Sequence, residues 1–164
     1  MKWLRKFQRF YRYPAELKWM FLEAYCLLGW ARILKLLPFA KVAPMLGDKM
    51  LETSHQSDPE QDQLVRKVSK AIHAMSKLTP WESQCLVRAI AAMRMLEKRG
   101  VSSTLYLGSG RDENGKMIAH AWLRSGNFLV TGNEGLERFV VVGIFGNQAS
   151  RRAANRTPER GLEG

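Results

Sequence analysis

The sequence lacks the features by which several classes of protein are recognised. It holds two cysteines, Cys26 and Cys85, with no CxxC and no Cys/His ligand spacing, so neither a disulfide framework nor a zinc site is predicted. No apolar run reaches the ~18 uncharged residues of a membrane-spanning helix, and no small-x-small cleavage site follows the basic start. Walker, GxGxxG, HExxH and EF-hand spacings are absent too. We therefore expect no metal and no cofactor, and a cytoplasmic location.

The composition is that of one packed globular domain. Hydrophobic residues make up 46% of the 164 residues and charged residues 25%, which are ordinary values. The charge is one-sided, with 26 Lys and Arg against 15 Asp and Glu, a net charge of +11. Residues 1–41 carry nine of the basic residues and two of the acidic ones. This excess favours an acidic partner, a nucleic acid or an anionic membrane surface.

Hydrophobic periodicity predicts three helices in the first part of the chain. Residues 15–37 are apolar around most of a helix circumference, with an interruption expected at Gly29. Residues 42–58 are typical of a loop, and Asp58-Pro59 predicts the start of a helix that runs to about Lys77. Thr79-Pro80-Trp81-Glu82 fits a capping box, so the third helix is expected to begin there and to end before Gly100.

The apolar period then changes from 3.6 to 2, which predicts strands separated by Gly-, Asn- and Asp-bearing turns. The fold class is therefore α+β, with amino-terminal helices followed by an antiparallel sheet. The expected strands are residues 103–108, 117–124, 128–131 and 139–145. We divide the chain into a basic amphipathic helical segment, a catalytic core and a disordered basic tail: residues 1–50, 58–146 and 147–164.

Cys85 and His120 are the candidate catalytic pair. The capping box places Cys85 one to two turns inside a helix start, where unpaired amides and the helix dipole favour an anion, and the thiolate is the nucleophilic form. His120 is the histidine of the strand region, and period-2 alternation puts it on the face of Trp122 and Arg124. The Cys85 amide is a candidate oxyanion donor, and Gln84 is a weaker one.

The hairpin after His120 predicts the third catalytic residue. If Gly126-Asn127 is a two-residue turn, counting back along the two strands puts Asn133 directly opposite His120. Asn133 would then orient the imidazole in a Cys-His-Asn arrangement. A slip of one residue would put Gly132 there and leave Glu134 as the nearest acidic candidate.

Simpler interpretations stay open for each of these residues. Free cysteine is often a compact buried hydrophobe, and a strand histidine can simply bond a carbonyl, so Cys85 or His120 taken alone proves little. His55 in a polar loop, His73 beside an apolar helix face and Cys26 in an apolar helix are expected to be structural or solvated.

Several motifs follow one another in an order that resembles a known family: Pro80-Trp81, Cys85-Leu86, Ala89, Gly100, Leu107-Gly108, Ala119-His120-Ala121-Trp122-Leu123 and Glu137-Arg138-Phe139. Across roughly residues 60–146 the chain resembles the transglutaminase-like cysteine protease of lasso-peptide biosynthesis, in the version where the leader peptidase is a separate short protein. The resemblance implies a transglutaminase-like (papain-like) core, with Cys85 as nucleophile and His120 as general base and acid. That family usually has an aspartate in the strand after the histidine, whereas no Asp follows Asp112 here.

The resemblance also implies a reaction and partners. Such a peptidase removes the leader of a lasso-peptide precursor through a thioester that water hydrolyses, which frees the core amino terminus for macrolactam formation. The implied partners are the leader peptide, a separate winged-helix-like leader-recognition protein and a macrolactam synthetase. The basic amino-terminal region is expected to dock the presenting protein or the leader, or to touch a membrane surface. Two alternatives stay open: a non-catalytic basic binding protein for membranes or nucleic acid, and a transglutaminase-type acyl transferase.

Overall fold

The computed structural model describes residues 13–56 and 58–148 of the chain. Its first half is helical and its second half is made of strands. In chain order the elements are α2 (Ala15–Leu34), α3 (Phe39–Val42), the 3-10 turn η1 (Ala43–Met45), β1 (Asp48–Lys49), α4 (Pro59–Ser76), α5 (Cys85–Glu97), β2 (Ser103–Arg111), β3 (Met117–Ser125), β4 (Phe128–Thr131), the 3-10 turn η2 (Leu136–Arg138) and β5 (Phe139–Asn147).

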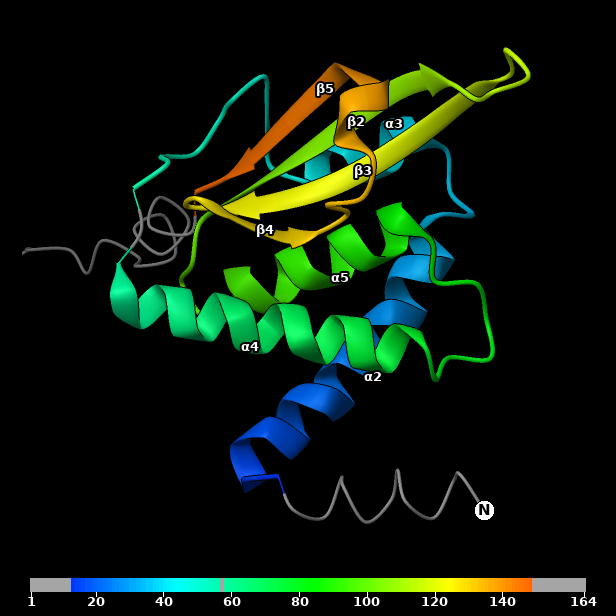
Figure 1. The fold of residues 1–164 in the computed structure, drawn as a ribbon. Coiled ribbons are helices and arrows are strands. Elements are labelled where there is room, and N and C mark those ends of the chain that lie inside the picture. The colour runs from blue at the N-terminus through cyan, green and yellow to red at the C-terminus, as the bar shows by residue number, and fades with distance from the viewer. Residues whose placement is uncertain (1–12, 57, 149–164) are drawn as a thin grey trace, which may run out of the picture.

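The five strands form one antiparallel sheet in the order β1-β5-β2-β3-β4 (Figure 1). β2 pairs with β3 on one side, with Gly108 opposite His120, and with β5 on the other side. Residues 132–138 carry the chain from β4 at one edge across to β5, and η2 lies within this crossover. β2 is thus the central strand of the sheet, between β5 and β3.

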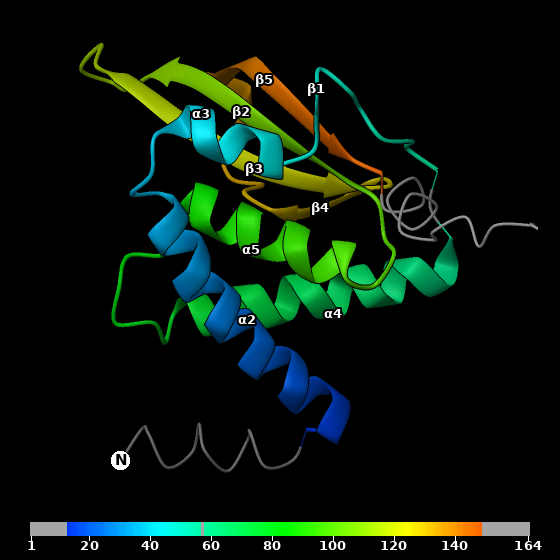
Figure 2. The ribbon, with the colours of Figure 1, turned by 180° about the vertical axis from the view of Figure 1, so that it is seen from behind.

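The helices cover one face of the sheet in two layers (Figures 1 and 2). α5 packs against β2, β3 and β4, α4 packs against β4 and α5, and α2 crosses on the far side of α4 and α5. The apolar core lies between these layers. This architecture confirms the predicted α+β class with helices before an antiparallel sheet. Fully buried members of the core include Leu28, Val68, Ile72, Ile90, Met95, Leu105, Leu123 and Val130.

The first two predicted helices are confirmed within a few residues. α2 ends at Leu34 and continues through Gly29 without a break. A Cβ at Gly29 would lie 3.3 Å from Cζ2 of Trp81, so this glycine allows α2 to approach the loop before α5 closely. α4 begins as predicted, because the side chain of Asp58 accepts a hydrogen bond of 3.2 Å from the amide of Glu60.

The predicted loop over residues 42–58 is partly wrong, because η1 and β1 lie within it. All four predicted strands are confirmed, and three of them are longer than expected. Asn147, the first residue of the predicted tail, belongs to β5 and is buried, and Gln148 is also described. Residues 149–164 lie outside the described residues. In the part of the chain that the structure describes, no helix is long and apolar enough to cross a membrane.

Candidate active site

Cys85 is the first residue of α5, which begins later than the capping box predicts. The amide of Arg88 donates to the carbonyl of Gln84 at 3.0 Å, so the amides of residues 85–87 precede the first intrahelical hydrogen bond. The thiol is half-buried at the margin of the core. The cysteine therefore lies at the positive end of the helix, closer to it than the sequence indicated.

The loop before α5 is held by its own polar groups. The hydroxyl of Thr79 donates to the carbonyl of Trp81 at 3.1 Å and lies 2.8 Å from the hydroxyl of Ser83. Thr79 is thus engaged in the loop and does not cap a helix. Gln84, the weaker oxyanion candidate, donates through its side-chain amide to Glu82 at 2.5 Å and accepts from Lys35.

The imidazole of His120 is fixed by one hydrogen bond and two rings. Its Nε2 lies 2.9 Å from the carbonyl oxygen of Gly132. The ring stacks on Phe139 at 4.9 Å and on Trp122 at 5.9 Å between centroids. A carbonyl only accepts, so Nε2 carries the hydrogen in the neutral ring and Nδ1 keeps its lone pair. The arrangement makes Nδ1 the basic nitrogen of His120.

Gly108 makes room for these rings. It lies opposite His120 in the β2–β3 ladder, so both residues face the same side of the sheet. A Cβ at Gly108 would lie 2.7 Å from Cζ3 of Trp122 and 2.9 Å from Cβ of Phe139. We call Trp122, His120 and Phe139 the ring cluster. Trp122 and Phe139 pack directly against the backbone of Gly108, which has no side chain.

The predicted register of the β3–β4 hairpin is wrong at its far end. The turn is as expected, with Ser125 opposite Phe128, but a bulge between Leu123 and Arg124 shifts the ladder by one residue. β4 ends with Thr131 opposite Leu123, so Asn133 is not paired with His120. The side chains of Asn133 and of the alternative, Glu134, are exposed. The catalytic role assigned to Asn133 stays a prediction, and the observed partner of the imidazole is the Gly132 carbonyl.

Cys85 and His120 come from neighbouring layers of the molecule. α5 packs against the face of the sheet that carries Ala121 and Leu123, and its first turn lies under β3 in both views (Figures 1 and 2). Strand alternation puts His120 on the opposite face, together with Trp122. No hydrogen bond joins the thiol and the imidazole among residues 13–56 and 58–148.

The edge of β3 is open at the level of His120. β4 pairs only with residues 123–125 of β3, so the first part of β3 has no strand beside it on that side among the described residues. Ala119 is exposed there, and the carbonyl of Gly132 reaches the imidazole along this edge. This free edge of β3 therefore lies between the face of the sheet that carries His120 and the face on which α5 packs.

Sequence reasoning missed an ion pair behind the ring cluster, between the buried Arg124 and the exposed Glu52. Arg124 is 7% exposed and donates to Glu52 at 3.1 Å, to the Thr53 carbonyl at 2.8 Å and to the Tyr106 hydroxyl at 2.9 Å. Tyr106 also donates to Glu52 and stacks on Trp122 at 5.5 Å. The one signal in the sequence was Arg124 itself, a charged residue that strand alternation puts on the same face as His120.

Ionisation in this network follows from its contacts. The hydrogen bond from Tyr106 lowers the pKa of Glu52, burial opposes it, and the charge of Arg124 lowers it further. Burial raises the pKa of Tyr106, and the hydrogen bond to Glu52 raises it further. Glu52 is therefore the anion of the network and Tyr106 its neutral donor, an arrangement that fixes Tyr106 behind the ring cluster.

The remaining candidates of the sequence have no catalytic surroundings. Nδ1 of His73 lies 2.8 Å from the carbonyl of Ser69, four residues earlier on the same helix. His55 is exposed, 3.4 Å from Glu52, and Cys26 is exposed on α2. Within the described part of the chain, no cluster of His, Cys, Asp and Glu could hold a metal ion.

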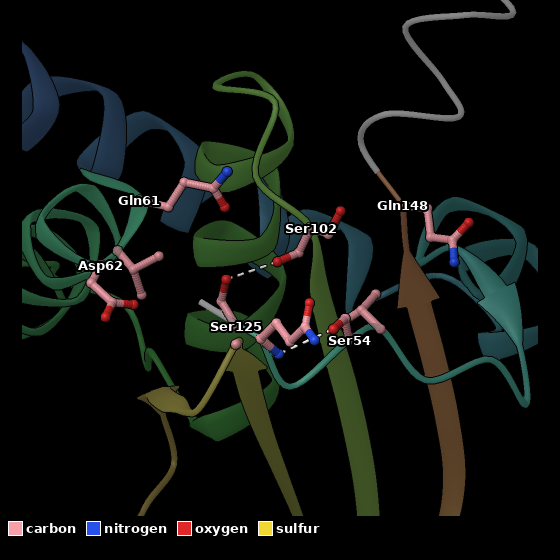
Figure 3. A pocket seen from close by; sticks show the side chains of 10 residues that line it. Ser54, Gln61, Asp62, Ser102, Ser125 and Gln148 are labelled. Carbon is pink, nitrogen blue, oxygen red and sulfur yellow. Dashed lines mark hydrogen bonds between the residues drawn. The ribbon is translucent and has the colours of Figure 1, made fainter. Parts of the chain in front are cut away.

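A polar cavity of about 300 Å³ lies at the far end of β3 from His120 (Figure 3). Ser125, the last residue of β3, lines it and donates to the Ser102 carbonyl at 2.8 Å. Neither Cys85 nor His120 lines this cavity. It is therefore separate from the candidate catalytic pair.

The comparisons with known proteins identify the class. The family model of the transglutaminase-like superfamily matches residues 28–143, well over half of the chain, from within α2 to β5. The chain belongs to this superfamily, whose members are typically cysteine-dependent enzymes, either proteases or acyl transferases. No curated protein and no solved structure matches it.

Proposed function

We propose that this protein is a cysteine peptidase that removes the leader peptide from a lasso-peptide precursor. The superfamily match supports cysteine-dependent chemistry. The Cys-Leu and Ala-His-Ala-Trp motifs, at Cys85 and His120, support the finer assignment by resemblance. The observation that carries the proposal is a cysteine at the first position of a helix that packs beneath the strand of His120, whose tautomer is fixed by the Gly132 carbonyl.

The chemistry is acyl transfer to water. Nδ1 of His120 takes the thiol proton of Cys85, and the thiolate attacks the carbonyl carbon of the scissile peptide bond. The first-turn amides of α5 donate to the oxyanion. The imidazolium then protonates the leaving amine, which is the new amino terminus of the core peptide. Water, deprotonated by the same imidazole, hydrolyses the thioester and releases the leader as a carboxylate.

Gly132 takes the positioning role that an Asp or Asn side chain has in related triads. Its carbonyl holds Nε2–H and thereby selects the tautomer in which Nδ1 is basic. Catalysis requires the imidazole and the thiol to meet around the open edge of β3. The precursor, a separate winged-helix-like leader-recognition protein and a macrolactam synthetase are the proposed partners.

The first test measures cleavage. Precursor is incubated with the protein and the leader-recognition partner, and the products are weighed by mass spectrometry. We expect two fragments whose masses sum to that of the precursor plus one water. Cys85→Ala should abolish them, whereas Cys26→Ala, which removes the exposed cysteine of α2, should not. Cleavage that survives Cys85→Ala contradicts the mechanism.

A second test examines the pairing of Cys85 with His120 without any substrate. Iodoacetamide reacts with the thiolate form of a cysteine, and a base that takes the thiol proton speeds the reaction. We expect iodoacetamide to alkylate Cys85 faster than Cys26 in the same molecule. His120→Ala should remove the difference. Equal rates in the wild-type protein would contradict the pairing.

Product masses separate the other functions. A transglutaminase-type acyl transferase would join the acyl group to an added amine and give a heavier product with no gain of water. A non-catalytic basic binding protein would give no product, and Cys85→Ala would change nothing. Either result would replace the peptidase assignment.

A further inference from the structure

The outer side of α2 carries a continuous row of exposed apolar side chains. Trp19, Leu22, Cys26 and Ile33 follow one another at intervals of three, four and seven residues, which is the spacing of one helix face. Trp19 is 70% exposed, Leu22 53% and Ile33 63%. Past the end of the helix the row continues with Leu36, Leu37 and Phe39, all exposed. We call these seven residues the α2 stripe.

The exposed face of α2 that carries the α2 stripe is distinct from the face that packs in the core. The inner side of the same helix is separately apolar, and it buries Met20, Ala24, Leu28 and Ala31 against α4 and α5. α2 therefore packs one apolar face in the core and exposes a second apolar face to solvent. Exposed apolar patches of this length mark interaction surfaces in soluble proteins.

We infer that the α2 stripe docks the protein on an anionic membrane surface. The nine basic residues of positions 1–41 lie in the segment that contains α2. Its two acidic residues are both paired: Glu16 with Lys67 of α4 at 3.5 Å, and Glu23 with Arg99, just after the end of α5, at 2.6 Å. An apolar helix face that ends in a tryptophan, within a basic segment, is the composition of helices that lie in the interface of anionic bilayers.

The charge argues against a second copy of the chain as the occupant. Two copies joined through their α2 stripes would bring two strongly basic segments together, and like charges at an interface oppose association. The sequence before α2 adds to the same sign: between Met1 and Tyr13 it has five basic residues and no acidic one, with aromatic or leucine residues every few positions. Binding to an anionic surface would neutralise this excess of positive charge.

The orientation places the two ends of the α2 stripe at different distances from the candidate active site. The first part of α2 lies on the side of α4 and α5 away from the sheet (Figures 1 and 2). The other end lies beside the site, because Lys35 donates to Gln84, next to Cys85, and the ring of Phe39 lies 6.0 Å from that of Phe145 of β5. The inference does not depend on the proposed peptidase activity.

The test uses the full chain and vesicles of phosphatidylcholine, alone or mixed in equal parts with phosphatidylglycerol. Co-sedimentation is expected only with the anionic vesicles and should weaken as salt is added. The double variant Trp19→Ser with Ile33→Ser should bind at least about ten-fold more weakly, because two apolar side chains no longer enter the interface. Each basic residue reversed in the first segment, such as Arg5→Glu, should cost about a further five-fold.

Two matched controls make the result specific. Val140→Ser with Met117→Ser removes two side chains that are 73% and 67% exposed on the sheet, and it should leave binding unchanged. In the Cys85→Ala protein, an environment-sensitive dye on Cys26 should brighten with anionic vesicles, whereas its signal should not change with neutral ones. The thermal stability of each variant shows that it is folded.

Any of four results would overturn the inference. One is equal vesicle binding by the stripe variant and the sheet control. Another is a dye on Cys26 that does not respond while the protein sediments. The third is a dimer in solution that the stripe variant dissociates, which would assign the α2 stripe to self-association. The fourth is an acidic protein that binds the α2 stripe when vesicles do not.

Discussion

Replacing Gly108 with alanine tests the ring cluster around His120. The added Cβ would lie 2.7 Å from the Trp122 ring and 2.9 Å from the Cβ of Phe139, closer than real Cβ contacts allow. The second of these neighbours cannot rotate away, because a Cβ is fixed by its backbone. β2 and β5 must therefore separate locally, and the ring of Trp122 must shift from its place between Tyr106 and His120.

The expected cost is that of overpacking a well-filled site, about 1–3 kcal/mol in the free energy of unfolding. For a protein of this size each kcal/mol lowers the melting temperature by about 2–4 °C, so Gly108→Ala should melt about 2–12 °C lower than the wild-type protein. Urea unfolding and a thermal scan measure the two quantities. Cleavage of precursor should fall as well, because the imidazole loses its stacking partners.

Gly143→Ala is the matched control. Gly143 lies in β5, and a Cβ there would meet Phe145 at 3.5 Å and Leu107 at 3.6 Å, which is ordinary contact. Both substitutions restrict the unfolded chain equally, so this gain cancels between them. We expect Gly143→Ala to be within about 0.5 kcal/mol of the wild-type protein. Equal melting temperatures for the two variants would refute the crowding around Gly108.

Three further predictions concern the surroundings of the site. Tyr106→Phe removes a hydroxyl that joins two charged side chains and should lower the free energy of unfolding by about 1.5–3 kcal/mol in urea titrations; an unchanged midpoint would contradict the network. Burial raises the pKa of Glu23, but the hydrogen bond and charge of Arg99 outweigh it and leave the pKa below its ordinary value. Its contribution to stability is therefore present above about pH 4.5 and lost as the pH falls further, so Glu23→Gln should lower the melting temperature at neutral pH and flatten its decline between about pH 5 and pH 3. Asn133→Ala and Glu134→Ala should each leave turnover within about a factor of two, since both side chains are exposed; a large loss at Asn133 would restore it as the third catalytic residue.

Local signals in the sequence predicted most of the fold. Asp58-Pro59 marks the start of α4 because its capping bond involves only neighbouring residues. The change from a period of 3.6 to a period of 2 after Gly100 places the sheet, because each strand alternates between a helix-covered face and the other face. Cys85 was correctly assigned to a helix start, although the start itself was set too early.

The errors arise where distant contacts decide between local alternatives. Thr79 can cap a helix or hold a loop, and the choice depends on the hydroxyl of Ser83 and on the packing of Trp81 against α2. The bulge at Leu123 and Arg124 accompanies the bonds that Arg124 makes to residues of the loop after β1. No turn residue encodes these contacts, so counting back from the turn gave the wrong register.

The partner of the His120 imidazole is the carbonyl of Gly132 and not a carboxylate, so other groups must stabilise the imidazolium. A carboxylate both orients an imidazole and stabilises the imidazolium that forms in the reaction, whereas a carbonyl orients it and offers only a partial charge. The ring cluster compensates for part of this difference, because His120 stacks on Phe139 and Trp122 within the ~6 Å over which an aromatic face attracts a cation. The backbone of Gly108 and the hydrogen bonds of Arg124 behind Trp122 hold the rings of Trp122 and Phe139 in place. A histidine without an acidic partner therefore depends on residues that the sequence motifs contain, Gly108, Trp122 and Phe139, and on two features that sequence reasoning missed, the Gly132 carbonyl and the Arg124 network.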